Sequence, residues 1–326
     1  MNNLKKIGLT ALAASLVSTS VFAGEVTVSG GASMAVEGYS GTAQNAGKGF
    51  SMGNQLTFSG SGELDNGLTA SISFVLDQGD NEATTASEGT APFDSHSVSI
   101  SSDALGTLTM HGEGGSSAQS ALDTTAAGDI WDTFDNAAFT TGQTVKSSAA
   151  GGDIMVYTLP SMVDDLSVSV SYDPQQGTAA SSTAYGLTYT GVEGLSVSYG
   201  KGDASTGVST TEADATTMKA SYAYGSFTVA YSNNDYQTAV ANSDQETTSY
   251  KVSYTVSDEL SISYGQEEIE KENDSDDAEF EAITVAYTSG GMTLTASAKE
   301  STNAAHNGTS TIDDRDYWSL GLAFAF

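Results

Sequence analysis

The chain has 326 residues with 41 acidic and 10 basic side chains, no cysteine, a net charge of −31 and a pI near 4.1. This acidity excludes the basic surface that nucleic-acid binding needs. The lack of cysteine excludes a disulfide framework and thiolate metal sites. Beyond the N-terminus no stretch approaches the about twenty apolar residues of a spanning helix. A membrane β-barrel is not excluded, because only alternate residues of its strands face lipid.

Residues 1–23 are predicted to be a cleaved secretory signal peptide. Lys5 and Lys6 form a basic start, residues 7–17 are mainly apolar, and Ala23 ends the segment with a small side chain. The apolar run is too short for a spanning helix. The mature chain would keep eight basic residues, of which Arg315 is the only arginine.

An alternation of large apolar and small polar residues recurs through the rest of the chain. It is clearest at 166–172, 195–199, 227–231 and 260–264, each ending on tyrosine, and its period of two predicts strands. A short turn cluster precedes each of these runs, and another alternating run precedes the cluster, so the segments form hairpins. At their other ends lie polar stretches that are predicted to be long loops, such as 200–215, 232–246, 265–278 and 300–314.

Counting the alternating runs predicts about sixteen strands, or fourteen if one pair is miscounted. Short turns at one rim and long loops at the other are typical of outer-membrane barrels. The predicted fold is therefore all-β, a transmembrane antiparallel β-barrel over residues 24–326 with short periplasmic turns and long extracellular loops. The strands are expected to begin near Val26, Phe50, Leu68, Ser95, Thr107, Asp153, Leu166, Thr183, Leu195, Ala215, Phe227, Thr247, Leu260, Glu279, Met292 and Asp316.

The polar face of these strands consists almost wholly of Ser, Thr, Ala and Gly. A face exposed to bulk water would carry more charge, whereas small residues suit the lumen of a wide barrel, which stays water-filled at about sixteen strands. A soluble all-β repeat or adhesin domain is the alternative. The last strand is expected to face lipid and close the barrel, with one apolar face made of Trp318, Leu320, Leu322, Phe324 and Phe326.

Three segments resemble the general bacterial porins of Gram-negative bacteria, specifically the alphaproteobacterial type: Glu63–Gly67, Tyr157–Pro160 and Asp316–Phe326. The resemblance implies a homotrimer of sixteen-stranded barrels in the outer membrane, each with its own pore. It also implies that the terminal strand is the signal read by the barrel assembly machinery. A third implication is that the third long loop, here residues 112–152, folds inward and narrows the channel.

Residues 112–152 form the longest segment without alternation, and a loop of this length is usually functional or disordered. As a constriction it would bring five carboxylates to the pore, and its aromatic residues Trp131, Phe134 and Phe139 would hold it against the wall. A solvated surface loop is the alternative. The five acidic residues are Glu113, Asp123, Asp129, Asp132 and Asp135.

The resemblance also implies a row of arginines on the wall opposite the acidic loop, which this chain lacks. Parity with the outward residues Tyr222 and Tyr254 places a few basic side chains inward and predicts only a weak basic wall. The acidic loop should then dominate and make the pore prefer cations. The basic wall residues are Lys219, Lys251, Lys299 and Arg315.

The outer loops carry a further acidic group that would add a negative funnel at the entrance: Glu267, Glu268, Glu270, Glu272, Asp274, Asp276 and Asp277. These carboxylates either bind Ca²⁺ or Mg²⁺ loosely through oxygen ligands or are simply solvated and screened. No other cofactor is expected.

The function predicted from the sequence is an outer-membrane porin for passive diffusion of ions and small hydrophilic solutes. An enzyme is not expected, because His96, His111 and His306 are scattered and no nucleophile or nucleotide motif occurs. A structural or adhesin barrel with acidic surface loops and a solute-specific channel are the alternatives. The expected partners are outer-membrane lipid, the assembly machinery, two further copies of the chain, and small solutes including cations.

Overall fold

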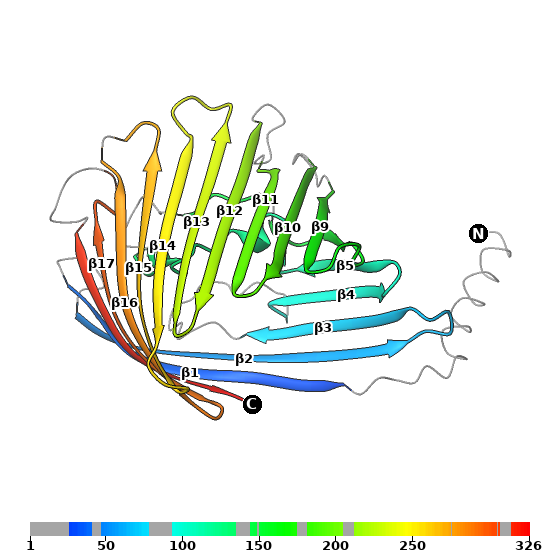
Figure 1. Ribbon diagram of the computed structural model, residues 1–326, viewed down its shortest axis with the longest axis horizontal. Coiled ribbons are helices and arrows are strands. Elements are labelled where there is room, and N and C mark those ends of the chain that lie inside the picture. Colours follow the sequence, from blue (N-terminus) through cyan, green and yellow to red (C-terminus); the bar gives the residue numbers. More distant parts are fainter. Residues whose placement is uncertain are drawn as a thin grey trace, which may run out of the picture.

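The computed structural model describes residues 26–40, 47–77, 93–134, 144–148, 150–174, 181–204, 212–274, 276–304, 306 and 314–326. Within them sixteen strands close into one antiparallel barrel (Figure 1), which confirms the predicted fold class and strand number. The predicted signal peptide lies outside the described residues. In the described part no helix is long and apolar enough to span a membrane.

Every predicted strand is present, and its first residue lies within a few positions of the expected one. The barrel strands are β1 Thr27–Tyr39, β2 Gly47–Glu63, β3 Thr69–Asp77, β4 Ser95–Ser102, β5 Gly106–Glu113, β8 Ile154–Thr158, β9 Leu166–Asp173, β10 Ser182–Val192, β11 Leu195–Asp203, β12 Ala213–Tyr224, β13 Phe227–Thr238, β14 Gln245–Thr255, β15 Leu260–Lys271, β16 Ala278–Ser289, β17 Met292–Thr302 and β18 Arg315–Ala325. Four short elements lie between β5 and β8, namely β6 Gly115–Ser116, the 3₁₀ helices η1 Ser120–Leu122 and η2 Ile130–Thr133, and β7 Ala150–Gly151.

The barrel closes where the first and last strands pair. Gly31 of β1 lies opposite Ala325 of β18, and backbone bonds of 2.8 and 3.0 Å join Gly30 and Phe326 in both directions. Gly30 has no room for a side chain, because a Cβ there would lie 2.7 Å from the carbonyl oxygen of Gln55. Closure leaves no strand edge with unpaired backbone groups in the membrane.

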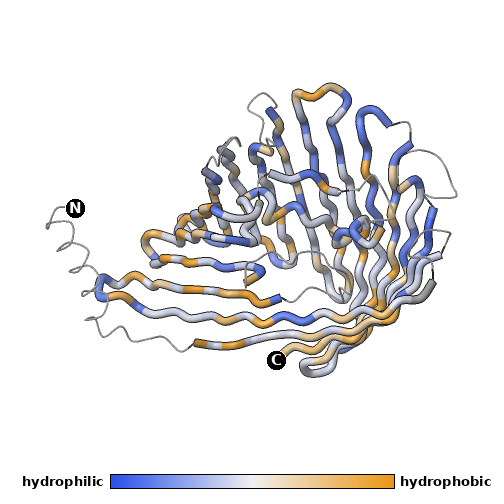
Figure 2. Tube along the Cα trace, turned by 180° about the vertical axis from the view of Figure 1, so that it is seen from behind, coloured by the Kyte–Doolittle hydropathy of each residue, from blue (hydrophilic) through white to orange (hydrophobic). Residues whose placement is uncertain are grey.

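Apolar and polar residues alternate along the strands (Figure 2), with the apolar set on the outer face. Aromatic pairs join neighbouring strands on this face, such as Tyr231 with Tyr250 at 5.2 Å and Phe227 with Tyr254 at 4.8 Å between ring centroids. Such aromatic residues mark the two membrane–water boundaries of a barrel. The predicted terminal face is exposed on β18, where Trp318, Leu320, Phe324 and Phe326 are between 40% and 73% accessible.

Two of the predicted loops are shorter than expected. Strand β13 continues to Thr238 and β15 to Lys271, so the connections are 239–244 and 272–277 rather than 232–246 and 265–278. The reason is that the outer ends of these strands rise above the apolar belt, so that their outward side chains, such as Asp235, Glu268 and Glu270, are polar. The pattern of period two therefore disappears although the backbone pairing continues.

Candidate functional site

Residues 114–153, here named the inner loop, connect β5 to β8, and the part that the structure describes, 114–134, 144–148 and 150–153, runs inside the barrel. Figure 1 shows this segment in teal behind strands β9–β14. Hydrogen bonds join it to inward residues of β9, such as Ser171, and of β17, such as Lys299. The inner loop therefore covers the part of the wall between these strands, and it reaches β1 at Thr133, whose carbonyl oxygen accepts the hydroxyl of Tyr39 at 3.0 Å.

Inward serine hydroxyls of the wall accept backbone N–H groups of the inner loop on three separate strands. These bonds satisfy donors that the irregular loop backbone cannot satisfy itself. The pairs are Ala118 N with Ser171 Oγ at 2.9 Å, Ala126 N with Ser232 Oγ at 2.8 Å and Ala127 N with Ser249 Oγ at 2.9 Å.

Amide side chains extend this set of bonds at the β12–β13 wall. Gln119 of the loop donates to Thr217 Oγ1 at 2.8 Å, and its amide oxygen accepts from the backbone of Ser148 at 2.7 Å. Asn234 of β13 donates to the carbonyl oxygen of Asp123 at 2.9 Å. Gln119 and Thr217 are fully buried, so this part of the loop is packed directly on the wall.

Glu267 of β15 is the one acidic side chain that is fully buried in the described part of the chain. One carboxylate oxygen accepts the hydroxyl of Thr125 and the other accepts the backbone N–H of Trp131 at 3.0 Å. A buried carboxylate is stable only when its oxygens are hydrogen-bonded or paired with a charge. Glu267 thus joins the middle of the inner loop to the wall by two bonds.

Glycines of the wall let the loop backbone come close. A Cβ added to Gly186 of β10 would lie 2.3 Å from the carbonyl oxygen of Ala118, and one added to Gly265 of β15 would lie 2.8 Å from Cβ of Ala127. Both distances are too short for non-bonded atoms. The wall under the inner loop is therefore shaped for backbone contact rather than for side chains.

An apolar cluster holds the segment of the inner loop around residues 130–134. Ile130 and Phe134 pack among Ile269 and Phe280 of β15 and β16, and the rings of Phe134 and Phe280 stack with centroids 5.8 Å apart. All four side chains are buried. Trp131 is partly buried at the edge of this cluster, whereas Phe139 lies outside the described residues.

Lys219 and Lys299 point inward, as strand parity predicted, and both bond to the inner loop rather than facing it. The Nζ atom of Lys219 donates to the carbonyl oxygen of Thr124 at 2.6 Å, and Nζ of Lys299 donates to Thr133 Oγ1 at 2.5 Å. Lys251 shares the inward face of β14 with Ser249, which also touches the loop, and Arg315 is 5% exposed. Parity gave the inward direction, but it carries no information on which strands the loop covers.

Three of the five predicted constriction acids are described on the inner loop itself. Asp132 is exposed, and Asp123 and Asp129 are partly buried. Asp129 also closes a turn, because its Oδ1 accepts the backbone N–H of Thr125 at 2.9 Å. Glu113 belongs instead to the end of β5, where a bulge places it opposite His96. Asp135 lies outside the described residues.

The pKa of Asp123 is raised from 3.8 to about 6, first because burial disfavours the charged form and further because of the nearby Asp129. A raised pKa keeps the neutral acid present at higher pH. Asp123 therefore loses its charge when the pH falls through about 6.

We expect the preference of the pore for cations to weaken between pH 7.5 and 5, because Asp123 is about nine-tenths protonated at pH 5 if its pKa is 6. The reversal potential of purified protein under a KCl gradient, measured at both pH values, checks this. In Asp123→Asn the change over this range should be smaller than in the unchanged protein. An equal change in both proteins would mean that another group titrates.

The outer-loop acids proposed for a divalent ion are not brought together as a group. Asp274 Oδ2 lies 3.8 Å from Nδ1 of His306, and the carbonyl oxygen of Asp276 is 3.0 Å from the same nitrogen. Asp277 lies instead with Glu268 and Glu270 of β15, with ligand atoms within 4.8 Å of one another. The sequence analysis included these two residues in the acidic outer loop, whereas the structure places them at the end of β15.

A family model described as Gram-negative porin matches residues 8–288. The chain belongs to the Gram-negative porin family. Its fold is similar to the anion-selective porin of Comamonas acidovorans, at 16% identity over 93% of this chain and 99% of that chain, with a TM-score of 0.69. It is also similar to a loop L8 deletion mutant of OmpT from Vibrio cholerae and to a mutant of the Rh. blastica porin, at 14% and 15% identity and TM-scores of 0.67 and 0.66; each comparison covers 93% of this chain and at least 99% of the other.

Comparison with curated proteins finds no match. At these identities the likeness to solved structures shows the fold alone, and the family shows the class of protein. This porin is therefore an outer-membrane channel of Gram-negative bacteria, and its family points to transport rather than to enzymatic activity.

Proposed function

We propose that this porin forms a water-filled channel for passive diffusion of ions and small hydrophilic solutes, and that it prefers cations. The observation that carries the proposal is the distribution of charge in the lumen. Asp123, Asp129 and Asp132 lie on the inner loop, whereas Lys219 and Lys299 donate hydrogen bonds to loop oxygens. Both lysines keep their charge, but they lie on the side of the lumen that the inner loop covers, whereas Asp132 is exposed on the loop to passing ions.

On the wall that faces the inner loop, β1–β5 and β8, the side chains that the structure describes include no lysine or arginine that could balance these acids. Parity places hydroxyl residues there toward the lumen, such as Ser33, Ser73 and Ser97, together with the carboxylate of Asp77. A narrow pore with carboxylates and hydroxyls concentrates cations and repels anions.

The anion selectivity named for the Comamonas acidovorans porin does not carry over to this chain. Two barrels of one fold can select opposite charges, because selectivity depends on the few side chains at the constriction. We therefore base the proposed sign on the residues of this lumen.

The test is the reversal potential of the refolded protein in a planar bilayer under a KCl gradient. We expect the cation-selective sign, and Asp132→Asn should shift the potential toward zero because it removes an exposed carboxylate of the inner loop. Asp258→Asn, in the turn between β14 and β15 at the opposite rim, is the matched control and should leave the potential unchanged. An anion-selective sign for the unchanged protein would overturn the proposed preference.

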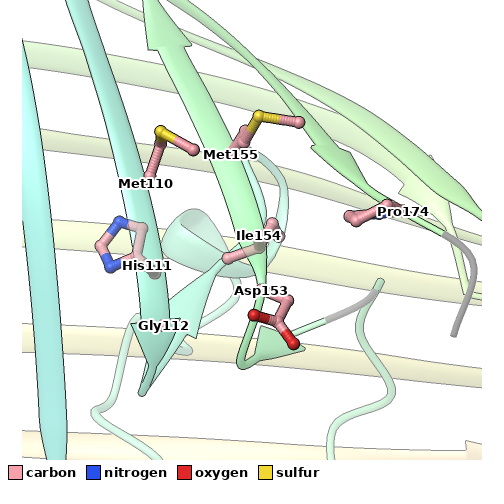
Figure 3. Close-up of a pocket in the computed structure, with 7 residues that line it drawn as sticks. All are labelled: Met110, His111, Gly112, Asp153, Ile154, Met155 and Pro174. Atoms are coloured by element: carbon pink, nitrogen blue, oxygen red, sulfur yellow. The ribbon is translucent and has the colours of Figure 1, made fainter. Parts of the chain in front are cut away.

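We also propose that the porin is a homotrimer whose subunits meet over β1–β5 and β8. In the described part, no tyrosine or tryptophan points outward from β1–β5, and on β8 the outward aromatic residue is Tyr157, so this side has fewer tyrosines than β10–β15. It carries two cross-strand methionine pairs instead, Met34 with Met52 and Met110 with Met155. Figure 3 shows the second pair beside a pocket of about 420 Å³. Methionine is enriched in protein interfaces. An aromatic belt is needed only where a strand faces lipid, so a side that contacts another subunit does not need one.

We expect Met110→Arg to weaken the trimer, because Met110 is 54% exposed in the single chain and a charge buried in an interface is strongly unfavourable. Native mass spectrometry of the detergent-solubilised protein measures the fraction of trimer. Val229→Arg, at an outward position of β13 that is 48% exposed, is the matched control and should leave that fraction unchanged. Equal trimer fractions for the two variants would contradict the proposed contact side.

A further inference from the structure

The first and last strands of the barrel meet at a seam that no connecting segment spans. Every other pair of neighbouring barrel strands is consecutive in the chain, whereas β1 and β18 are brought together by their own pairing. That pairing runs from Gly31 with Ala325 to Gly38 with Trp318 and joins opposite ends of the chain. Pairing between segments so far apart in sequence costs more chain entropy than a hairpin does. The seam is therefore the pairing that gains most from further contacts across it.

The seam is fastened in different ways at its two ends. At the short-turn end, backbone hydrogen bonds in both directions join Gly30 to Phe326. At the other end, the hydroxyl of Tyr317 on β18 donates to Glu37 Oε2 on β1 at 2.7 Å, and the rings of Tyr39 and Tyr317 lie 4.8 Å apart. Strand parity places these three side chains on the lumen face, where the inner loop can reach them.

Thr133 of the inner loop lies at this end of the seam and bonds to the strands on both sides of β18. Its carbonyl oxygen accepts the hydroxyl of Tyr39 on β1 at 3.0 Å, and its Oγ1 accepts Nζ of Lys299 on β17 at 2.5 Å. The ammonium group of Lys299 also lies 5.6 Å from the ring centroid of Tyr317 on β18. One residue of the loop is thus bonded to β17 and to β1, and β18 lies between these strands.

The loop segment that carries Thr133 is itself firmly held. Ile130 and Phe134, on either side of it, are buried in the apolar cluster with residues of β15 and β16, and Tyr317 packs against the same cluster. Because the segment is anchored there, β1 cannot move away from β18 without breaking the bond between Tyr39 and Thr133. A contact of this kind opposes opening of the seam.

We propose that the inner loop has a second function besides lining the channel, which is to fasten the seam of the barrel. Residues 130–134, here named the strap, reach from the β15–β16 wall across β17 and β18 to β1. The proposal depends on these contacts and not on the sign of the ion selectivity.

The position of the strap distinguishes it from the other bonds of the inner loop. The bonds to Ser171, Ser232 and Ser249 attach the loop to β9, β13 and β14, whose neighbours on both sides are consecutive strands. Those bonds fix the loop at places where the chain already connects the strands. The bonds of Thr133 instead lie on both sides of the pairing that has no connecting segment.

Hydrogen–deuterium exchange of the full-length porin, measured by mass spectrometry on peptides of β1 and β18, tests the proposal. Tyr39→Phe keeps the ring and removes the donor to Thr133, so the amides of the seam should exchange about fivefold faster, as expected for the loss of one hydrogen bond. Thr133→Val removes the acceptor of Lys299 and should change the exchange in the same direction. Peptides of β10 and β11 should exchange as in the unchanged protein in both variants.

Ser171→Ala is the matched control, because it also removes one bond between the inner loop and the wall, but at β9. Its seam should exchange at the rate of the unchanged protein. Unchanged seam exchange in both Tyr39→Phe and Thr133→Val would overturn the proposal. Equally fast seam exchange in Ser171→Ala, or faster exchange in every strand of the two strap variants, would refute it in favour of a general loosening. A lower trimer fraction in native mass spectrometry of both strap variants would assign the faster exchange to a subunit contact and not to the strap.

Discussion

Replacing Glu267 by alanine is expected to release the middle of the inner loop from the barrel wall. The substitution removes both acceptors for the Thr125 hydroxyl and the Trp131 backbone N–H, in a place where the carboxylate is fully buried. Each buried donor left without a partner costs about 1–3 kcal/mol. Both donors can recover a partner by moving into the water of the lumen, so the loop should detach locally around Thr125 and Trp131.

Single-channel recording measures the consequence as current fluctuation. We expect Glu267→Ala to show noisy or frequently interrupted steps, because a loop that moves in the lumen changes the cross-section open to ions. Glu267→Gln, which keeps one acceptor oxygen, should lie between the alanine variant and the unchanged protein. Glu270→Ala on the same strand is exposed and should give quiet steps. Quiet steps from the Glu267→Ala variant would show that Glu267 does not hold the loop.

The barrel was predictable because membrane strands repeat one simple constraint. Each strand alternates between lipid and lumen, so runs such as 195–199 and 260–264 have the same pattern wherever they occur. The pattern weakens where the outward side chains become polar. For this reason the outer ends of β13 and β15 were assigned to loops, although their backbones pair as far as Thr238 and Lys271.

The constriction was predictable in part, because its chemistry is local but its contacts are not. The acids and aromatic residues of the inner loop could be read from its composition. Its place on the wall depends on hydrogen bonds to strands that follow more than fifty residues later, such as that of Ala118 with Ser171. Serine is common on every inward face of this chain, so no single serine marks the contact.

Two features of the sequence could have indicated where the loop lies. Glu267 is an acidic residue at an inward position, where most other residues are small and neutral, and a lone inward acid needs a partner. Gly186 and Gly200 occupy inward positions of neighbouring strands β10 and β11 and lie opposite each other. Glycine weakens a strand unless another segment approaches it closely, so the pair indicates a contact.

Replacing Gly186 by alanine should push the inner loop toward the lumen and lower the single-channel conductance. The new Cβ would lie 2.3 Å from the carbonyl oxygen of Ala118, and neither the strand nor the loop backbone can give way without moving. Overpacking of this kind costs about 1–3 kcal/mol. The strand is fixed by pairing on both sides, whereas the loop is held by fewer bonds, so the loop is the part that moves.

Gly49→Ala is the matched control for this prediction. Gly49 is paired with Glu37 on the lumen face across from the inner loop, and a Cβ there would meet only that side chain, at 3.7 Å. The single-channel conductance of the Gly49→Ala variant should therefore equal that of the unchanged protein. If Gly186→Ala lowered the unfolding temperature but left the conductance unchanged, the wall would have bent outward. The loop would then be the stiffer partner, and the width of the pore would depend on the inner loop more than on the barrel that surrounds it.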